Sequence, residues 1–191
     1  MAIGQIPFKT GVFYVLLSGV VMFLAIFLGI RTGLAVKGDQ FGDLTPKTVG
    51  NQTSLKLGQT LPATAIRAAD GRELTLREIS GGKQTLIAVV MPGCGPCKKL
   101  LTGWQTKGIV GTGDRQVVLL AAVTPGNLDL GELSEFKDKY TVYFCDFVKL
   151  DDDCGVNSFP SLIGVGKDNT IKFVANSFIH QLDNKFFDKY L

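Results

Sequence analysis

The sequence predicts an α/β protein in which helices flank a central mixed sheet and a transmembrane helix comes first. Three observations lead to this prediction. The continuous apolar runs at 85–91 and 115–123 have the length and β-branched content of buried strands. A segment with helix-forming character follows each run, at 98–107 and 130–140. Nearer the N-terminus, residues 11–30 contain no charged side chain.

Charge is distributed unevenly along the 191 residues. The chain has 20 Lys and Arg against 17 Asp and Glu, a net charge of +3. Lys9, Arg31 and Lys37 are the only charged side chains in residues 1–37, so the remainder of the chain is neutral. Because phosphate binding requires a basic face, we expect no nucleic-acid partner.

The uncharged run at 11–30 predicts a membrane anchor. Its 20 residues would form a helix about 30 Å long, the thickness of the bilayer core. A cleaved signal peptide has a shorter apolar region and a small-x-small cleavage site. We therefore expect an uncleaved anchor at 11–31 in contact with the lipid bilayer, with cleavage as the alternative. It would join an N-terminal segment at 1–10 to a tether at 32–54 and a folded domain at 55–191.

The folded domain begins with β-type patterns. Residues 63–69 and 73–76 lie on either side of the turn Asp70-Gly71, as in a hairpin. Residues 76–79 then predict a short helical turn, and the strand at 85–91 follows.

The rest of the chain alternates between strands and helices. The run at 115–123 and a strand at 141–147 flank the predicted helix at 130–140, so these two strands should be parallel. Strands at 162–165 and 170–175 predict a hairpin. The apolar residues of 178–190 share one face of a terminal helix: Phe178, Ile179, Leu182, Phe186, Phe187 and Tyr190.

Two cysteines lie where the strand at 85–91 gives way to a helix. The first N–H groups of a helix are unpaired and its dipole is positive there, which favours a thiolate at Cys94. The thiolate is the attacking species in thiol–disulfide exchange. Cys97 lies one turn further on, where it can resolve a mixed disulfide at Cys94, and Pro96 is tolerated in the first helical turn. This spacing predicts a redox dithiol.

Other residue types that bind metals lack the spacing of a metal site. A structural zinc site needs a second ligand pair, which Cys145, Cys154 and His180 do not form by their spacing. The three aspartates at 151–153 lack the spacing of a calcium-binding EF-hand and predict a solvated loop. We therefore expect neither a metal nor a cofactor.

Several motifs resemble one known group of proteins. Cys94-Gly95-Pro96-Cys97 is similar to the active-site motif of thioredoxin. The segments LGQTLP at 57–62, DGRELTL at 70–76 and GVNSFPSL at 155–162 resemble membrane-tethered extracytoplasmic thioredoxin-like proteins of the TlpA/ResA type. The resemblance covers about residues 55–191 and implies a thioredoxin-like fold.

The resemblance also implies a substrate-binding surface. A cis peptide bond before Pro160 would expose the backbone of Phe159 to an extended client peptide, as in strand addition. Gly95 and Pro96, between the two cysteines, would border the same surface.

Three features depart from the family pattern. Many relatives have an aromatic-rich run with a Trp just before the first cysteine, where Met91-Pro92-Gly93 stands here. Ala88 stands where thioredoxin carries a buried acid, and Leu100 stands where ResA-type proteins carry a Glu. Neither usual proton acceptor for Cys97 is therefore present, and its deprotonation would fall to water or to a partner group. Lys98 and Lys99 are expected to favour the thiolates electrostatically.

Cys145 and Cys154 leave two alternatives open. Both precede the proline loop closely enough for a disulfide between them, either structural or exchanging with the first pair. Alternatively they are free thiols buried as small apolar residues. We expect the disulfide.

Together these features predict a membrane-anchored thiol–disulfide oxidoreductase. A second cysteine pair fits an oxidising compartment, so the domain is expected to face the periplasm or an equivalent lumen from the cytoplasmic membrane. The resemblance implies reduction of client proteins that carry a disulfide or CxxC, in cytochrome c or metalloenzyme maturation, with electrons from an upstream membrane or soluble dithiol. The alternative is a thioredoxin-like structural subunit or assembly factor without essential redox turnover.

Overall fold

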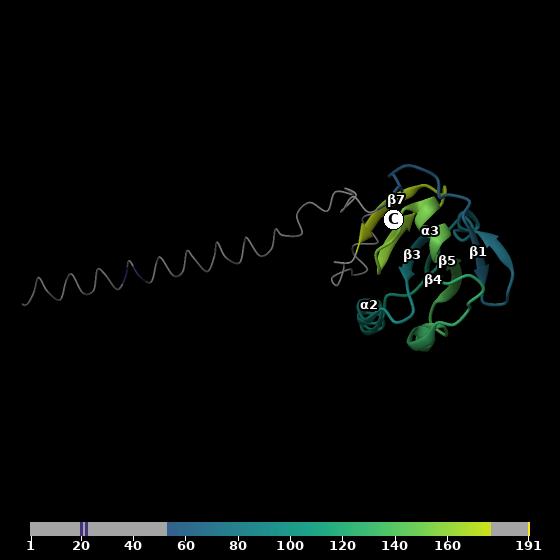
Figure 1. Ribbon diagram of the computed structural model, residues 1–191. Helices are drawn as coiled ribbons and strands as arrows, with labels where there is room; N and C mark the ends of the chain where they lie inside the picture. Colours follow the sequence, from purple (N-terminus) through teal and green to yellow (C-terminus); the bar gives the residue numbers. More distant parts are fainter. Residues whose placement is uncertain (1–19, 21, 23–52, 177–190) are drawn as a thin grey trace, which may run out of the picture. The chain divides into compact units, whose positions relative to one another are not determined.

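The computed structural model describes residues 20, 22, 53–176 and 191. The chain divides into two units, Met1–Thr45 and Pro46–Leu191, and the description here concerns the second (Figure 1). The predicted N-terminal segment at 1–10, the terminal helix at 178–190, and nearly all of the anchor and tether lie outside the described residues. Within the described residues, no helix combines the length and the apolar composition needed to cross a membrane.

A mixed sheet forms the centre of the second unit. In the part of the chain that the structure describes, it has seven strands in the order β2-β1-β5-β4-β3-β6-β7. β3, β4 and β5 are parallel, and every other pair is antiparallel. The strands are β1 Ala65–Ala68, β2 Glu73–Thr75, β3 Gln84–Val90, β4 Arg115–Val123, β5 Thr141–Asp146, β6 Ser161–Val165 and β7 Ile171–Asn176.

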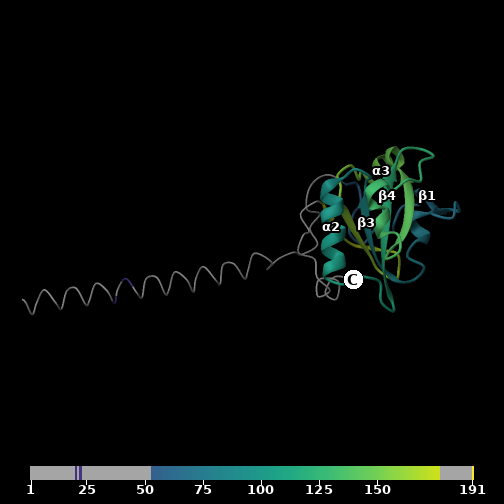
Figure 2. The ribbon, with the colours of Figure 1, turned by 90° about the horizontal axis from the view of Figure 1, so that it is seen from below.

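Among the described residues, α2 and α3 cover opposite faces of the sheet. α2 (Gly95–Thr106) buries one side among the side chains of one face, and Figure 2 shows it alongside β3. α3 (Phe147–Cys154) buries Leu150 and Cys154 in the core of the other face. Because successive side chains of a strand point to opposite faces, the central strands supply apolar residues to both cores. This explains why β3 and β4 read as continuous apolar runs.

Most predicted elements are present in the structure. The strand predicted at 115–123 has the bounds of β4, and the predicted helical turn is the 3-10 helix η1 (Leu76–Glu78). The predicted parallel pairing of β4 with β5 is confirmed. The helix after the dithiol begins three residues earlier than predicted, at Gly95.

The helix predicted at 130–140 is wrong in type and length. The structure has a 3-10 helix there, η2 (Gly131–Phe136). Before it, Asn127 Oδ1 accepts the N–H of Asp129 at 2.8 Å, and Asp129 Oδ1 accepts the N–H of Gly131 at 2.8 Å. Such side-chain turns compete with the start of an α-helix. Leu133 and Phe136 are nevertheless buried, so the apolar spacing did identify the inward face.

The acidic stretch at 151–153 is helical and is not the predicted loop. Asp146 is the N-cap of α3, and its Oδ1 accepts the N–H of Val148 at 2.9 Å. The strand predicted at 141–147 therefore ends one residue early, because a capped helix begins at Phe147.

Replacing Gly164 with Ala is expected to destabilise the sheet. Gly164 in β6 pairs with Phe173 in β7, and an added Cβ would overlap the Phe173 ring. Overpacking of this kind costs about 1–3 kcal/mol. Gly103→Ala is the matched control, because this helical position has open space and should gain about 0.5–1 kcal/mol. Urea unfolding would contradict the account if Gly164→Ala matched wild type.

Candidate functional site

The cysteine motif lies at the end of the sheet formed by the carboxyl ends of its parallel strands. β3 ends at Val90, and a turn follows in which the N–H of Cys94 donates to the carbonyl oxygen of Met91 at 3.1 Å. Gly93 has a φ of 79° in this turn, a conformation that glycine adopts without steric cost. The strand and turn together deliver Cys94 to the start of α2.

Cys94 and Cys97 form a disulfide with a Cα–Cα distance of 5.2 Å. Cys94 is the N-cap of α2, and its Sγ accepts the N–H of Cys97 at 3.2 Å. Cys94 is half-buried, whereas Cys97 is fully buried. After reduction, the same N–H and the helix dipole would stabilise a Cys94 thiolate. Cys94 is thus the less buried cysteine of the pair.

The proline loop lies beside the dithiol. The Phe159–Pro160 peptide bond is cis. Ser161 begins β6 and pairs with Val89 in β3, two residues before the turn that carries Cys94. Phe159 is half-buried and packs against both cores. The roles predicted for Phe159 and Pro160 in binding a client remain predictions; both residues directly precede the strand that pairs with β3.

The surroundings of Cys97 are apolar. Ala88 and Leu100 are both buried in the same core as Cys97. Among residues 53–176, the buried polar side chains are Thr64, Ser80, Thr85 and Ser161, none of which is a carboxylate. No acid from this part of the chain therefore lies in the core with Cys97 to take its proton.

The two lysines after Cys97 are on the surface. Lys98 Nζ lies 3.4 Å from Glu135 Oε1, and both side chains are about half exposed. The Glu135 charge offsets the effect of Lys98 on the dithiol, and solvent screens what remains. Lys99 is exposed. Glu135 therefore weakens the effect that Lys98 was predicted to have on the thiolates. The predicted effect of Lys99 remains a prediction.

Sequence reasoning missed apolar side chains exposed at this end of the sheet. Phe147 and Val148 are 36% and 57% exposed, and Met91 before the dithiol is 38% exposed. The Phe147 ring centroid lies 6.0 Å from that of Phe159, at an interplanar angle of 53°. The signal that could have revealed them is Asp146, a helix-capping residue type directly before Phe147. It places the start of a helix, and hence Phe147, at the end of β5.

The disulfide predicted between Cys145 and Cys154 is not formed. Both cysteines are free and buried. The Cys145 Sγ lies 3.7 Å from the carbonyl oxygen of Ala65, whereas the Cys154 Sγ lies 3.7 Å from Thr64 Oγ1. Each thiol thus has its own polar neighbour in β1 or the residue before it. They match the open alternative of small buried side chains.

Burial raises the pKa of Cys145 to about 12, with the neighbouring Cys154 and Asp146 adding to the shift. Burial likewise raises the pKa of Cys154 to about 11, partly opposed by the Thr64 hydroxyl. The ordinary thiol value is 9.0. Both thiols are therefore neutral at physiological pH and unsuited to attack a disulfide.

These shifts predict a loss of stability at alkaline pH. Below pH 9 both thiols are protonated in the folded and unfolded chains, and their contribution is fully present. As the pH rises from 9 towards 11–12, only the unfolded chain ionises, at a cost of up to about 1.4 kcal/mol per pH unit for each thiol. Urea unfolding of the oxidised protein at pH 8–10 should show this slope. In a Cys145→Ala/Cys154→Ala variant the free energy of unfolding should change less with pH. Equal slopes for the variant and wild type would contradict the assignment.

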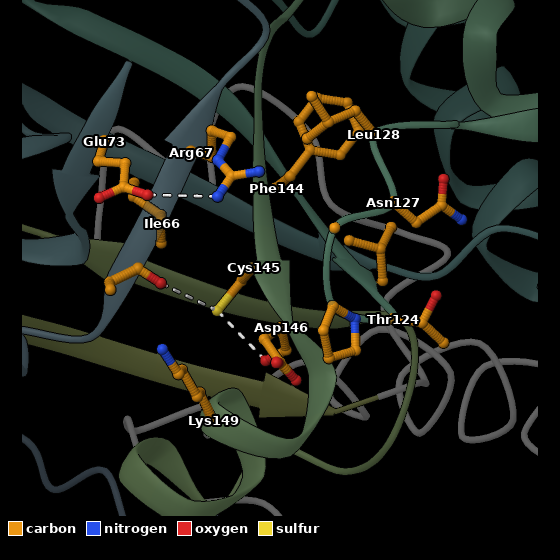
Figure 3. A pocket seen from close by; sticks show the side chains of 14 residues that line it. Ile66, Arg67, Glu73, Thr124, Asn127, Leu128, Phe144, Cys145, Asp146 and Lys149 are labelled. Carbon is orange, nitrogen blue, oxygen red and sulfur yellow. Dashed lines mark hydrogen bonds and ion pairs between the residues drawn. The ribbon is translucent and has the colours of Figure 1, made fainter. Parts of the chain in front are cut away.

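A pocket of about 250 Å³ lies at the ends of β4 and β5, apart from the dithiol (Figure 3). Arg67 and Glu73 form an ion pair of 3.2 Å at its rim. The Cys145 sulfur points away from Phe144, as neighbours in a strand do (Figure 3). Within the described residues, no group of three or more His, Cys, Asp or Glu could hold a metal ion.

Comparison with solved structures identifies the fold. The thioredoxin domain of a thiol-disulfide oxidoreductase from Bacteroides vulgatus aligns with a TM-score of 0.52 and 18% identity, covering 72% of this chain and 100% of that one. A second Bacteroides vulgatus protein, described as a thiol-disulfide oxidoreductase, aligns with a TM-score of 0.56 and 22% identity, covering 72% of this chain and 98% of that one. A protein from Aquifex aeolicus described as an electron transfer protein aligns with a TM-score of 0.55 and 16% identity, covering 71% of this chain and 92% of that one.

Comparison of sequences adds no relative. No protein-family profile matches the chain, and no curated protein matches it. At these identities the structural likeness establishes the fold. The chain has a thioredoxin-like α/β fold that carries a CxxC pair, Cys94 and Cys97, at the N-terminus of its helix α2.

Proposed function

We propose that the protein is a thiol–disulfide oxidoreductase that reduces disulfides of client proteins. One observation carries this proposal: the Cys94–Cys97 pair lies at the start of α2, with Cys94 half-buried and Cys97 fully buried. That asymmetry provides one thiol for a partner and one for resolution. The thioredoxin-like fold supports the same function.

The reaction proceeds in two exchanges. In the reduced protein, the Cys94 thiolate attacks a sulfur of the client disulfide, and the other client sulfur leaves as a thiolate that takes a proton. Cys97 then loses its proton and attacks the Cys94 sulfur of the mixed disulfide, releasing the second client thiolate. The client gains two electrons and two protons, and the protein is left with the Cys94–Cys97 disulfide. An upstream dithiol returns it to the reduced form.

The client would bind as an extended peptide along the edge beside the dithiol. Phe159 would offer its backbone, and Gly95 and Pro96, which follow Cys94 in the chain, are exposed. The exposed side chains of Met91 and Phe147 provide apolar contacts nearby. A client with an apolar residue close to its reactive cysteine fits this surface.

The cellular setting of the proposal comes from the sequence. The uncharged run at 11–30 supports a single-pass anchor at 11–31 in the cytoplasmic membrane. The tether at 32–54 would present the domain at 55–191 to the periplasm or an equivalent lumen. Clients would then be extracytoplasmic proteins, such as those matured in cytochrome c or metalloenzyme assembly, and the electron donor a membrane or soluble dithiol.

One observation favours a second candidate function. Within residues 53–176, neither core holds a carboxylate to take the proton of Cys97. A structural subunit or assembly factor of a membrane complex has no need of such a group. In cells that require the protein, full function of a Cys94→Ser/Cys97→Ser variant would favour this second role.

The oxidoreductase function is tested with purified full-length protein. Dithiothreitol supplies electrons, and reduction of the insulin disulfides is followed by precipitation of the free B chain. We expect wild type and a Cys145→Ala/Cys154→Ala control to accelerate the reaction equally, because the buried thiols take no part. The Cys94→Ser/Cys97→Ser variant should not exceed dithiothreitol alone. A wild-type protein no faster than dithiothreitol would contradict the proposal.

A further inference from the structure

Residues 53–55 are bound to the end of α3. The N–H of Ser54 donates to the carbonyl oxygen of Cys154 at 3.0 Å, and Thr53 Oγ1 donates to the same oxygen at 2.7 Å. The Thr53 hydroxyl also accepts the N–H of Leu55 at 3.1 Å. Leu55 is 3% exposed and belongs to the core that contains Cys154. We call residues 53–55 the clamp.

Gly155 is shaped to receive the clamp. It ends α3 in the left-handed conformation, with a φ of 61°, and its N–H donates to the carbonyl oxygen of Asp151 at 2.7 Å. A Cβ on Gly155 would lie 2.5 Å from the backbone nitrogen of Ser54 and 3.2 Å from the Cα of Thr53. Glycine therefore permits both the helix-ending turn and the close approach of the clamp.

The clamped helix end leads directly into the client-binding segment. Five residues, 156–160, connect Gly155 to the first residue of β6. Val156 is 1% exposed and packs in the same core as Leu55. At the other end, Ser161 Oγ donates to the carbonyl oxygen of Ser158 at 2.6 Å. Because this segment is short and held at both ends, its two attachments determine the position of Phe159.

We propose that Thr53 and Ser54 are positioning residues for the client-binding segment. By holding the carbonyl end of α3 they fix Gly155 and, through it, the place at which Phe159 presents its backbone. The inference rests on the proposed function, because it concerns how the client is held. It gives the last two residues of the predicted tether a role in positioning the segment that binds the client.

Two substitutions test the clamp in the full-length protein. Thr53→Val removes the hydroxyl and both of its hydrogen bonds while keeping the shape of the side chain. Thr53→Ser keeps the hydroxyl and is expected to keep both hydrogen bonds. Gly155→Ala drives the clamp away. Its matched control is Gly113→Ala, which imposes similar backbone strain at a φ of 56° but meets no atom within 4 Å. Circular dichroism establishes that each variant is folded at the assay temperature.

The readout separates positioning from general destabilisation. Thr53→Val and Gly155→Ala should raise the KM for insulin about three- to tenfold, the effect of one lost hydrogen bond in placing a ligand. Their kcat should change less. The rate at which reduced Cys94 reacts with a small disulfide, 5,5′-dithiobis(2-nitrobenzoate), should be unchanged, because this reagent needs no backbone partner. Thr53→Ser and Gly113→Ala should match wild type in both assays.

Several results would overturn the inference. One is an unchanged KM for insulin in folded Thr53→Val and Gly155→Ala protein; another is an equal rise in Gly113→Ala. Wild-type protein that does not accelerate insulin reduction contradicts the proposed function instead. In that case amide hydrogen exchange in β6 decides the inference. Faster exchange at 161–165 in the two clamp variants than in Gly113→Ala supports it, and equal exchange overturns it.

Discussion

Replacing Cys94 with Ser should reduce the turnover of a protein disulfide to the rate without protein. Cys97 does not replace the lost nucleophile, because it is fully buried while Cys94 is half-exposed. A serine hydroxyl is not ionised at neutral pH and does not form a mixed disulfide. Removing a covalent nucleophile typically costs roughly three orders of magnitude or more in rate. Initial rates of insulin reduction at saturating dithiothreitol measure the loss.

The control for this prediction is Cys145→Ala, which removes a buried thiol whose pKa is raised to about 12. It should retain wild-type turnover if the protein is folded. Substantial activity in Cys94→Ser, or comparable losses in both variants, would contradict the assignment of Cys94 as the attacking thiol.

The second large effect is the pH dependence of the resolving step. Within residues 53–176 no carboxylate lies in the core with Cys97, and we predict that water or the client takes its proton. Because the thiolate is the attacking species, the rate of resolution should rise as the pH rises from 6 to 8.

Stopped-flow kinetics on a preformed mixed disulfide measure this step directly. The complex is made between Cys94 and a peptide thiol while Cys97 is held protonated at low pH, and release of the peptide is followed after a pH jump. The rate of peptide release from wild type should increase with pH, and Cys97→Ser should release no peptide. A rate that stays constant between pH 6 and pH 8 would show that an internal base serves Cys97.

The central strands could be predicted because burial on both faces leaves a simple signal. β3 and β4 lie between two cores, so nearly every position is apolar, and the predicted bounds of β4 agree with the structure. The dithiol was found for a similar reason, since its chemistry depends on local spacing and on the start of a helix. Both features are encoded over a few consecutive residues.

Other features depend on contacts that local sequence does not encode. The turns made by Asn127 and Asp129 replaced an expected helix, although the apolar spacing favoured one. Whether Cys145 meets Cys154 depends on the direction of each side chain in the folded chain, and the two thiols have different neighbours. The contact of residues 53–55 with Gly155 joins segments about a hundred residues apart. Its only sequence signal is a glycine after a short helix.

The most direct test of the central claim is a trapping experiment in intact membranes with Cys97→Ser. Without the resolving thiol, a client attacked by Cys94 remains joined to it, and non-reducing electrophoresis with mass spectrometry identifies the adduct. We predict discrete adducts that disappear in Cys94→Ser/Cys97→Ser. A well-expressed Cys97→Ser protein that forms no Cys94-dependent adduct, in cells that require the protein, would contradict redox catalysis by this dithiol.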